Sequence, residues 1–392
     1  MNAAVANPPL QFAFTAEQQQ FRDSIARFCR THAPTARTRQ QMASDTGLDR
    51  EVWSGLCSDL GLSGVQVPES LGGQGFGQVE LGIVMEELGR ANVCAPYLAS
   101  SVLAANALVN AAAPGPRDEW LPQLCDGTQL ATLAVAEADG HWEPHRTTVA
   151  ARKTDRGWRL DGVKTYVLDG HVADLILVVA RAPGSHDHEG LSLFAVRAGA
   201  PGLQVRALNS LDPTRRLARV ECTGAEALLL SEEGAAGPGL DRAMDESLAA
   251  LASEMVGGAQ ALLDATVSYA KMRIQFGRPI GSFQAIKHRL ADLLLDVEFA
   301  RSAAYRACER AAEDPSPLRE VASVAKALAS DAFLLAAREA VQLHGGIGFT
   351  WEHDTHLYFK RAQSSSVLLG SAAEHRDRYV LSLAARTAGD RP

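Results

Sequence analysis

The chain has 392 residues, of which 46% are hydrophobic and 21% are charged, a composition that fits a multi-domain globular protein with an ample core. Its formal net charge of -8 argues against nucleic acid as a main partner, because nothing indicates a basic face that could follow a phosphate backbone. No apolar run is long enough to span a membrane, so we expect no membrane partner.

Cysteine spacing and the N-terminus both favour a cytoplasmic protein. The six cysteines lie far apart and form no CxxC pair, which is typical of ordinary reduced thiols. Residues 1–11 have neither a basic start nor an apolar h-region, so we find no secretion signal.

Residues 1–130 are predicted to form a helical N-terminal domain. After a loose tail up to about Ala13, Thr15 can act as the N-cap of a first helix. Apolar residues at helical spacing predict further helices over 51–62, over 79–90 and up to about Leu124. The glycine-rich segment 68–77 could be a phosphate cradle or a plain connector. Its spacing is not GxGxxG, which favours the connector.

Residues 131–235 are predicted to form a small β domain. Short β-prone segments lie at 131–136, 157–162, 174–180 and 191–196, with turn pairs such as Asp161-Gly162 between them. This succession of short strands and turns indicates a small antiparallel barrel or sandwich. His186 and His188 lie in a charged segment that we interpret as a solvated turn rather than a metal site.

Residues 236–392 are predicted to form a C-terminal four-helix bundle, which makes the whole chain an α+β protein. The apolar stripe that contains Leu248, Leu251 and Met255 predicts one long helix, and a second stripe begins near Ile286. A third helix is expected over 318–343, and a fourth is expected to end near Arg386. Antiparallel packing of four such helices gives an up-down bundle.

A short break separates the first two bundle helices. Gly277 permits a left-handed turn there, and Pro279 cannot continue the preceding helix. Just before the break, Arg273 and Phe276 place a cation beside an aromatic ring, a pair that suits a ligand with a phosphate and a flat heterocycle. For Arg273 alone, a plain charge at a helix end is the alternative interpretation.

Two segments resemble the signature of acyl-CoA dehydrogenases. The first is Arg273-x-Gln275-Phe276-Gly277-x-Pro279-Ile280 followed by Gln284, and the second is Gln342-Leu343-His344-Gly345-Gly346. In that family both segments reach across a dimer interface to the FAD of the neighbouring subunit. The resemblance covers nearly the whole chain, and it implies FAD contacts from Arg273, Phe276, Gln284, Gln342, His344, Gly345 and Gly346.

The wall that would hold the flavin ring within the same chain departs from the family pattern. Ala136 stands in place of the usual threonine of Thr-Glu-Pro, and Tyr166 stands in place of the usual tryptophan of Trp-x-Thr/Ser-Asn-Gly. The resemblance implies that Tyr166 still stacks on the flavin. Leu168, however, cannot donate the hydrogen bond that a threonine or serine would give.

The usual catalytic base is missing as well. Dehydrogenation needs a carboxylate in a dry pocket, but Leu369-Gly370-Ser371 stands where most members have Glu-Gly-Thr/Ser. Only the backbone N–H of Leu369 could still polarise a thioester carbonyl. Other members carry the base at a position that corresponds to Ser247, so we expect Glu246, or alternatively Glu254, to serve as the base.

The resemblance implies an FAD-dependent acyl-CoA dehydrogenase subunit that introduces an α,β double bond into an acyl-CoA and passes electrons to an electron-transfer flavoprotein. The departures resemble the heteromeric, steroid side-chain branch, which implies lipid or steroid catabolism and a homo- or hetero-tetramer with a paralogous subunit. Two alternatives stay open: a catalytically silent partner subunit, and a flavin oxidase or monooxygenase on the same scaffold. Glu352, His353, Asp354 and His356 are potential metal ligands, but no second cluster completes a site, so we expect no metal.

Overall fold

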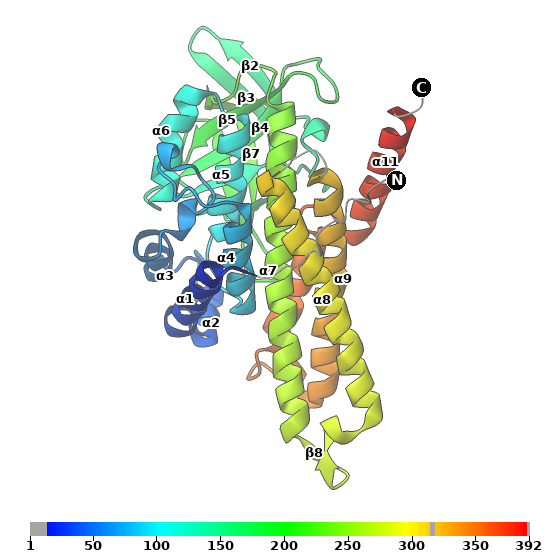
Figure 1. Cartoon of the computed structure of the whole chain (residues 1–392). Coiled ribbons are helices and arrows are strands. Elements are labelled where there is room, and N and C mark those ends of the chain that lie inside the picture. The colour runs from blue at the N-terminus through cyan, green and yellow to red at the C-terminus, as the bar shows by residue number, and fades with distance from the viewer. Residues whose placement is uncertain (1–13, 314–317, 390–392) are drawn as a thin grey trace.

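The computed structural model describes residues 14–313 and 318–389. Figure 1 shows N-terminal helices on one side, a β domain beside them, and a long helical bundle that extends away from both. The tail predicted over residues 1–13 lies outside the described part of the chain.

The N-terminal helices follow the predicted pattern in outline. They are α1 (Ala16–His32), α2 (Thr35–Ala43), α3 (Arg50–Ser54), α4 (Gln78–Arg90), α5 (Ala105–Ala111) and α6 (Pro114–Cys125). Thr15 caps α1 as predicted, since its hydroxyl accepts the backbone N–H of Gln18 at 3.2 Å. The single helix predicted over 51–62 is wrong in its second half, because α3 gives way to a wider π-helical turn over 55–59.

The glycine-rich segment 68–77 is a connector that folds onto its own domain. A Cβ on Gly73 would lie 2.1 Å from the carbonyl oxygen of Val67, so the loop has no space there for a ligand.

The β domain is a closed, mostly antiparallel sheet. Its strands are β1 (Ala131–Ala134), β2 (Ala150–Thr154), β3 (Gly157–Leu168), β4 (Leu175–Arg181), β5 (Leu191–Arg197), β6 (Leu203–Leu208) and β7 (Leu217–Leu229). They follow the order β1-β4-β2-β3-β7-β5, β4 also pairs with β5, and β6 pairs with β7. The predicted small antiparallel barrel is confirmed in outline, with the exception that β1 and β2 both run parallel to β4.

The C-terminal bundle contains α7 (Gly237–Met272), α8 (Gln284–Glu313), α9 (Leu318–His344), α10 (Thr355–Val367) and α11 (Ala372–Gly389). A two-stranded hairpin of β8 (Ile274–Gln275) and β9 (Arg278–Pro279) joins α7 to α8 at the far end of the bundle (Figure 1). The expected fourth helix is divided into α10 and α11 by a turn at Leu369 and Gly370, whose φ angles of 57° and 104° cannot belong to a right-handed helix.

Small residues allow the N-terminal helices to pack closely on the bundle. A Cβ on Gly89 of α4 would lie 2.0 Å from the carbonyl oxygen of Glu254 on α7, and one on Gly257 would lie 1.9 Å from that of Glu86. The two helices therefore approach backbone to backbone, and one continuous core holds both domains. Among residues 14–313 and 318–389, no helix combines the length and the apolar character needed to cross a bilayer.

Candidate functional site

A cavity of about 570 Å³ lies where the loop after β1, the start of α7 and the start of α11 meet. This volume is typical of a small-molecule site. Its apolar lining includes Met244, Leu248 and Leu369, so the structure places the residue at the family's usual base position against this cavity. Charged groups of both signs also line it: Glu143, Arg146, Asp241, Arg319, Glu374, Asp377 and Arg378.

Two buried side chains fix the turn at Leu369 and Gly370. His375 Nε2 lies 2.9 Å from the carbonyl oxygen of Leu369, and Lys326 Nζ donates to that of Gly370 at 2.9 Å. Burial lowers the pKa of Lys326 to about 7 and that of His375 to about 3. His375 is therefore neutral at pH 7, and its Nε2–H donates to the carbonyl of Leu369.

Sequence reasoning missed both residues. Lys326 does leave one signal in the sequence, because it is a charged residue inside the otherwise apolar stripe of α9.

Glu246 does not reach this cavity. Its carboxylate accepts hydrogen bonds from Asn110 Nδ2 at 2.7 Å and Arg242 Nε at 2.8 Å. Leu248, which lines the cavity, lies about 200° further around the helix, since each residue turns α7 by about 100°. Burial raises the pKa of Glu246, as a base requires, but the carboxylate and Leu369 are on different sides of α7.

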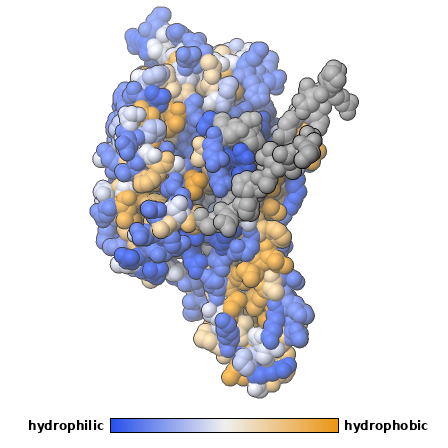
Figure 2. Space-filling model, in the orientation of Figure 1, coloured by the Kyte–Doolittle hydropathy of each residue, from blue (hydrophilic) through white to orange (hydrophobic). Residues whose placement is uncertain are grey.

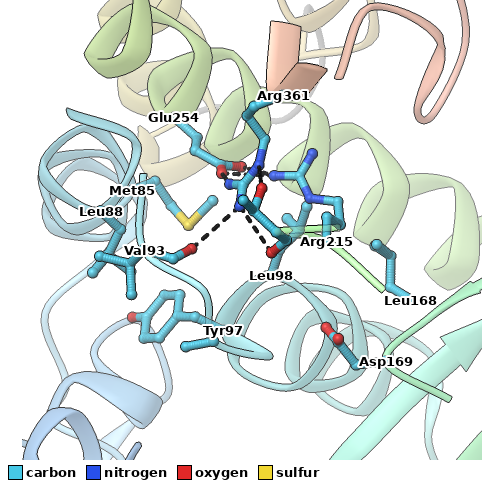
Figure 3. A pocket seen from close by; sticks show the side chains of 12 residues that line it. Met85, Leu88, Val93, Tyr97, Leu98, Leu168, Asp169, Arg215, Glu254 and Arg361 are labelled. Carbon is cyan, nitrogen blue, oxygen red and sulfur yellow. Dashed lines mark hydrogen bonds and ion pairs between the residues drawn. The ribbon is translucent and has the colours of Figure 1, made fainter. Parts of the chain in front are cut away.

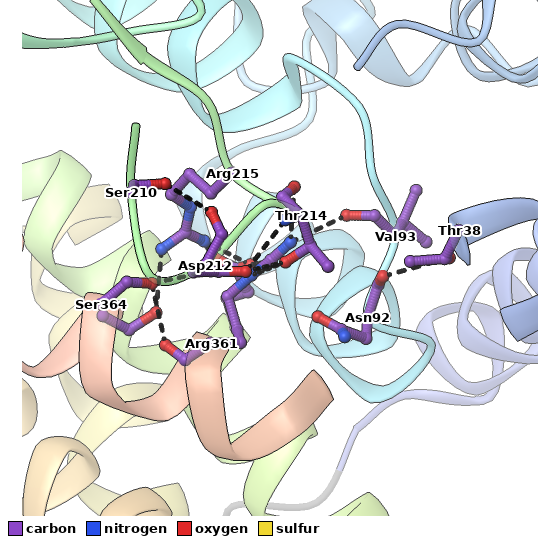
Figure 4. A network of polar contacts seen from close by, with 11 residues as sticks. Thr38, Asn92, Val93, Ser210, Asp212, Thr214, Arg215, Arg361 and Ser364 are labelled. Atoms are coloured by element: carbon purple, nitrogen blue, oxygen red, sulfur yellow. Dashed lines mark hydrogen bonds and ion pairs between the residues drawn. The ribbon is translucent and has the colours of Figure 1, made fainter. Parts of the chain in front are cut away.

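Glu254 lies in a buried network of charges. Both of its oxygens accept from Arg215 Nη2 at 2.6 Å, and one accepts from Arg361 Nη1 at 2.5 Å. Figure 3 shows the carboxylate next to these two guanidinium groups, with dashed lines for the contacts. Arg361 Nε also pairs with Asp212 at 3.2 Å, as Figure 4 shows from another side.

The adjoining cavity is much too small for an acyl group. It measures about 20 Å³, which is room for roughly one water molecule. Glu254 is thus committed to two arginines and does not face the cavity that Leu369 lines.

The two signature segments meet at the opposite end of α7. Tyr269, one turn before Arg273, stacks on His344 with 4.3 Å between ring centroids, and its hydroxyl donates to the carbonyl of His344 at 3.3 Å. The ring of His344 is buried between Tyr269 and His353, whereas the two glycines that follow it, Gly345 and Gly346, are exposed.

Most of the predicted cofactor residues around this contact are exposed. Phe276 is 91% exposed and takes a φ of 53°, and Arg273, Gln284 and Gln342 also face outwards. No carboxylate of the described residues pairs with Arg273.

The segment around Tyr166 carries an exposed ring next to a buried leucine. Tyr166 is 39% exposed, whereas Leu168 is buried and its carbonyl accepts from the hydroxyl of Thr132 at 2.5 Å. In the same segment, the buried Lys164 donates to Glu137 at 2.8 Å, so Glu137 has a structural partner.

The potential metal ligands of residues 352–356 form other contacts. His353 hydrogen-bonds with Thr355, and Asp354 pairs with Arg39 at 2.7 Å. Within the described residues, no three His, Cys, Asp or Glu side chains come together as a metal site would require.

Comparison with known proteins gives matches along most of the chain. Residues 15–128, 132–222 and 240–381 match the N-terminal, middle and C-terminal domains described for acyl-CoA dehydrogenases. The chain is 38% identical to acyl-CoA dehydrogenase IpdE2 of Mycobacterium tuberculosis over 358 residues, which cover 91% of this chain and 94% of that protein.

Two solved structures share the fold at similar identity. One is the ChsE4-ChsE5 complex from Mycobacterium tuberculosis, with a TM-score of 0.86, 31% identity, and 98% of this chain and 100% of that chain covered. The other is the Tcur3481-Tcur3483 steroid ACAD, with a TM-score of 0.86, 30% identity, and coverage of 95% and 99%.

Proposed function

Because the chain belongs to the acyl-CoA dehydrogenase family, we propose that it is one subunit of a heteromeric, FAD-dependent acyl-CoA dehydrogenase. The assembly would introduce an α,β double bond into a bulky acyl-CoA thioester and pass the electrons to an electron-transfer flavoprotein. This chain would present its hairpin to a flavin held by a paralogous subunit. The proposal rests on one contrast. The exposed residues Arg273–Phe276 keep the family's signature, whereas a buried leucine, Leu369, occupies the position where the family usually has its catalytic base.

The exposed end of the bundle fits part of an FAD molecule. The guanidinium of Arg273 suits a pyrophosphate, and the ring of Phe276 suits a stacked heterocycle. A Cβ on Gly345 or Gly346 would meet no atom within 4 Å, so a ligand can approach the backbone there. FAD, when bound, supplies a hydride acceptor that no side chain can provide.

The turn at Leu369 cannot remove a proton. Its side chain is 3% exposed and apolar, and the two carboxylates considered as substitutes, Glu246 and Glu254, are held by other partners. We therefore assign proton abstraction to a carboxylate of the paralogous subunit. This places the chain close to the alternative of a catalytically silent partner.

Two observations support a bulky acyl group. The cavity beside Leu248 and Leu369 is about 570 Å³, a volume that leaves room for a bulky acyl group. In addition, a similar solved structure is named a steroid ACAD.

Purification with and without a partner tests the proposal. The partner is the paralogous subunit from the same organism, which is co-expressed with this chain. Native mass spectrometry identifies it in the complex by its mass and stoichiometry. We expect the chain alone to be colourless and the co-expressed complex to be yellow and to reduce electron-transfer flavoprotein. A yellow homo-oligomer that oxidises acyl-CoA would overturn the heteromer, and substrate-dependent oxygen uptake would favour the oxidase alternative.

The role of Arg273 can be tested against its neighbour on the same hairpin. Arg273→Ala in the complex should weaken FAD binding roughly 10- to 100-fold, since a hydrogen-bonded charge contributes about 1.5–3 kcal/mol. Arg278→Ala is the matched control, because the Arg278 guanidinium stacks on Phe283 at 4.0 Å instead. Flavin content measured after dilution should fall only for Arg273→Ala; equal loss in both variants contradicts the assignment.

A further inference from the structure

One wall of the cavity beside Leu369 is a single loop between β1 and β2. All seven residues from Gly140 to Arg146 line the cavity, and Trp142 among them also packs against the main core. Within the described part of the chain, the backbone–backbone hydrogen bonds of residues 138–146 stay between Glu137 and Thr147. Side chains therefore have to fix the place of this loop.

A buried ion pair joins the two ends of the loop. The ammonium of Lys164, on β3, donates to the carbonyl of Val135 at 2.8 Å and to Glu137 Oε1 at 2.8 Å, both at the start of the loop. Its third donor binds Thr147 Oγ1 at 2.9 Å, at the end of the loop. All three N–H donors of the ammonium are thus used, and they bridge the two loop ends.

Glu137 extends this bridge to the backbone. Its Oε1 accepts the N–H of Thr148 at 2.8 Å and that of Val149 at 3.1 Å. Its Oε2 accepts the hydroxyl of Thr148. The side chain at the start of the loop therefore fixes the backbone at its end.

The pair is charged although it is buried. Figure 2 shows a mainly hydrophilic surface on the visible side of the β domain, whereas the side chain of Lys164 is 1% exposed and that of Glu137 is 12% exposed. Burial lowers the pKa of Lys164 to about 8 against the opposing effect of Glu137, so the ammonium is charged at pH 7.

Stability alone does not account for such a pair. Replacing a buried ion pair by well-packed apolar side chains of similar volume is often neutral or stabilising. Apolar side chains in place of Lys164 and Glu137, however, could not bind the two ends of the loop.

We propose that Lys164 and Glu137 are positioning residues for the acyl group, because their ion pair holds residues 138–146 in place as one wall of the cavity. The inference rests on the proposed function, since it takes this cavity as the acyl site, and it adds the residues that give the cavity its shape. Arg181 Nη2 also donates to the carbonyl of His145 at 2.9 Å, in the middle of the same loop. Loss of the ion pair should therefore loosen the loop rather than unfold it.

The test replaces the pair in the full chain, which is co-expressed with the paralogous subunit. Lys164→Met/Glu137→Leu removes both charges together, so the melting temperature should fall by less than about 3 °C. Hydrogen exchange of the backbone amides of residues 138–146, measured by mass spectrometry, should become about tenfold faster.

Lys153→Met/Glu233→Leu is the matched control. It makes the same two changes at an exposed ion pair of the β domain, where the two charged atoms are 3.5 Å apart and the side chains are 69% and 55% exposed. It should leave the exchange of residues 138–146 unchanged.

Thr147→Val is a milder variant that leaves the ion pair in place. Valine keeps the shape of the threonine side chain but cannot accept a hydrogen bond from Lys164. Exchange of the loop should become about threefold faster. This variant decides the question if Lys164→Met/Glu137→Leu does not fold.

A ligand separates this inference from the proposed function. The bulky acyl-CoA 3-cyclohexylpropanoyl-CoA should slow the exchange of residues 138–146 in the unmodified complex, and about tenfold more of it should be needed for the same protection in Lys164→Met/Glu137→Leu. Unchanged exchange of the loop in the double variant and in Thr147→Val, or equal protection by the ligand with and without the pair, would overturn the positioning role. A ligand that fails to protect the loop of the unmodified complex contradicts only the bulky acyl substrate, and the exchange rates without ligand then decide whether the pair fixes the loop.

Discussion

Leu369 takes a backbone conformation that its own side chain does not stabilise. A φ of 57° costs a leucine about 1–2 kcal/mol relative to a right-handed conformation. The conformation persists because Lys326 and His375 bind the carbonyls of Gly370 and Leu369, and neither contact involves the side chain at position 369. The turn is therefore independent of the carboxylate that the family usually places on it.

His375 makes stability depend on pH in a defined window. Its pKa is lowered to about 3 by burial, from an ordinary value of 6.5. Between these values the unfolded chain binds a proton that the folded chain does not, so stability falls as the pH drops from 6.5 towards 3. At pH 5 the loss is about 2 kcal/mol, from 1.36 kcal/mol for each unit of pKa.

His375→Gln isolates this contribution, because glutamine still has an N–H donor but does not titrate. Urea unfolding at pH 7 and pH 5 should show about 2 kcal/mol less acid destabilisation for the variant than for the unmodified chain. His288→Gln, at an exposed histidine of α8, is the control and should behave like the unmodified chain. Equal pH dependence in all three proteins would contradict the prediction.

A contiguous motif led to the cofactor residues predicted from the sequence, namely Arg273, Phe276 and the glycines at 345 and 346. The structure brings the two segments that carry them together. Glu246 could not be judged in this way, because one residue of helix rotation decides whether a carboxylate faces a cavity. Lys326 and His375 act through tertiary contacts that no local pattern encodes.

At the scale of elements, α7, α10 and the loop before β7 are joined by the charges around Glu254. Glu254→Gln would leave Arg215 and Arg361 facing an uncharged amide in a buried site. We expect the free energy of unfolding to fall by about 3–5 kcal/mol, as is typical when one member of a buried ion pair is removed.

A surface pair provides the control for this measurement. Glu226→Gln interrupts the exposed contact of Arg159 with Glu226 at 2.7 Å and should cost at most about 1 kcal/mol. Denaturant unfolding of both variants checks the difference, and similar losses in the two proteins would contradict a strong buried network.

Most elements that sequence reasoning missed lack a local signal. β2 is short and largely exposed, and it shows no clear apolar alternation. β6 is equally short, and its alternation of Leu203, Gln204, Val205 and Arg206 was overlooked. The pairing of β1 with β4 joins segments more than 40 residues apart, and no pattern within either strand encodes it. The division between α10 and α11 was missed because apolar residues continue on both sides of Gly370 and no proline marks the turn.

At the scale of the whole molecule, the exposure of the hairpin predicts that a substitution there can affect assembly without changing the folding stability of the isolated chain. Phe276→Ala should change the free energy of unfolding of the isolated chain by less than about 0.5 kcal/mol, because the side chain is 91% exposed. The same substitution should lower the flavin content of the complex. Thermal unfolding of the chain and flavin absorbance of the complex check the two parts, and a large loss of stability in the isolated chain would contradict the assignment.

The length of α7 has a consequence for how such a chain can change over generations. Leu248 lies on α7 and Arg273 directly follows its last residue, Met272, so 25 residues separate them, which is about 38 Å along the helix. Substitutions that erase reactivity at one extremity therefore leave the opposite extremity structurally untouched. A duplicated gene can therefore lose its catalytic residues one at a time while its product still contributes to the cofactor site of the paralogous chain.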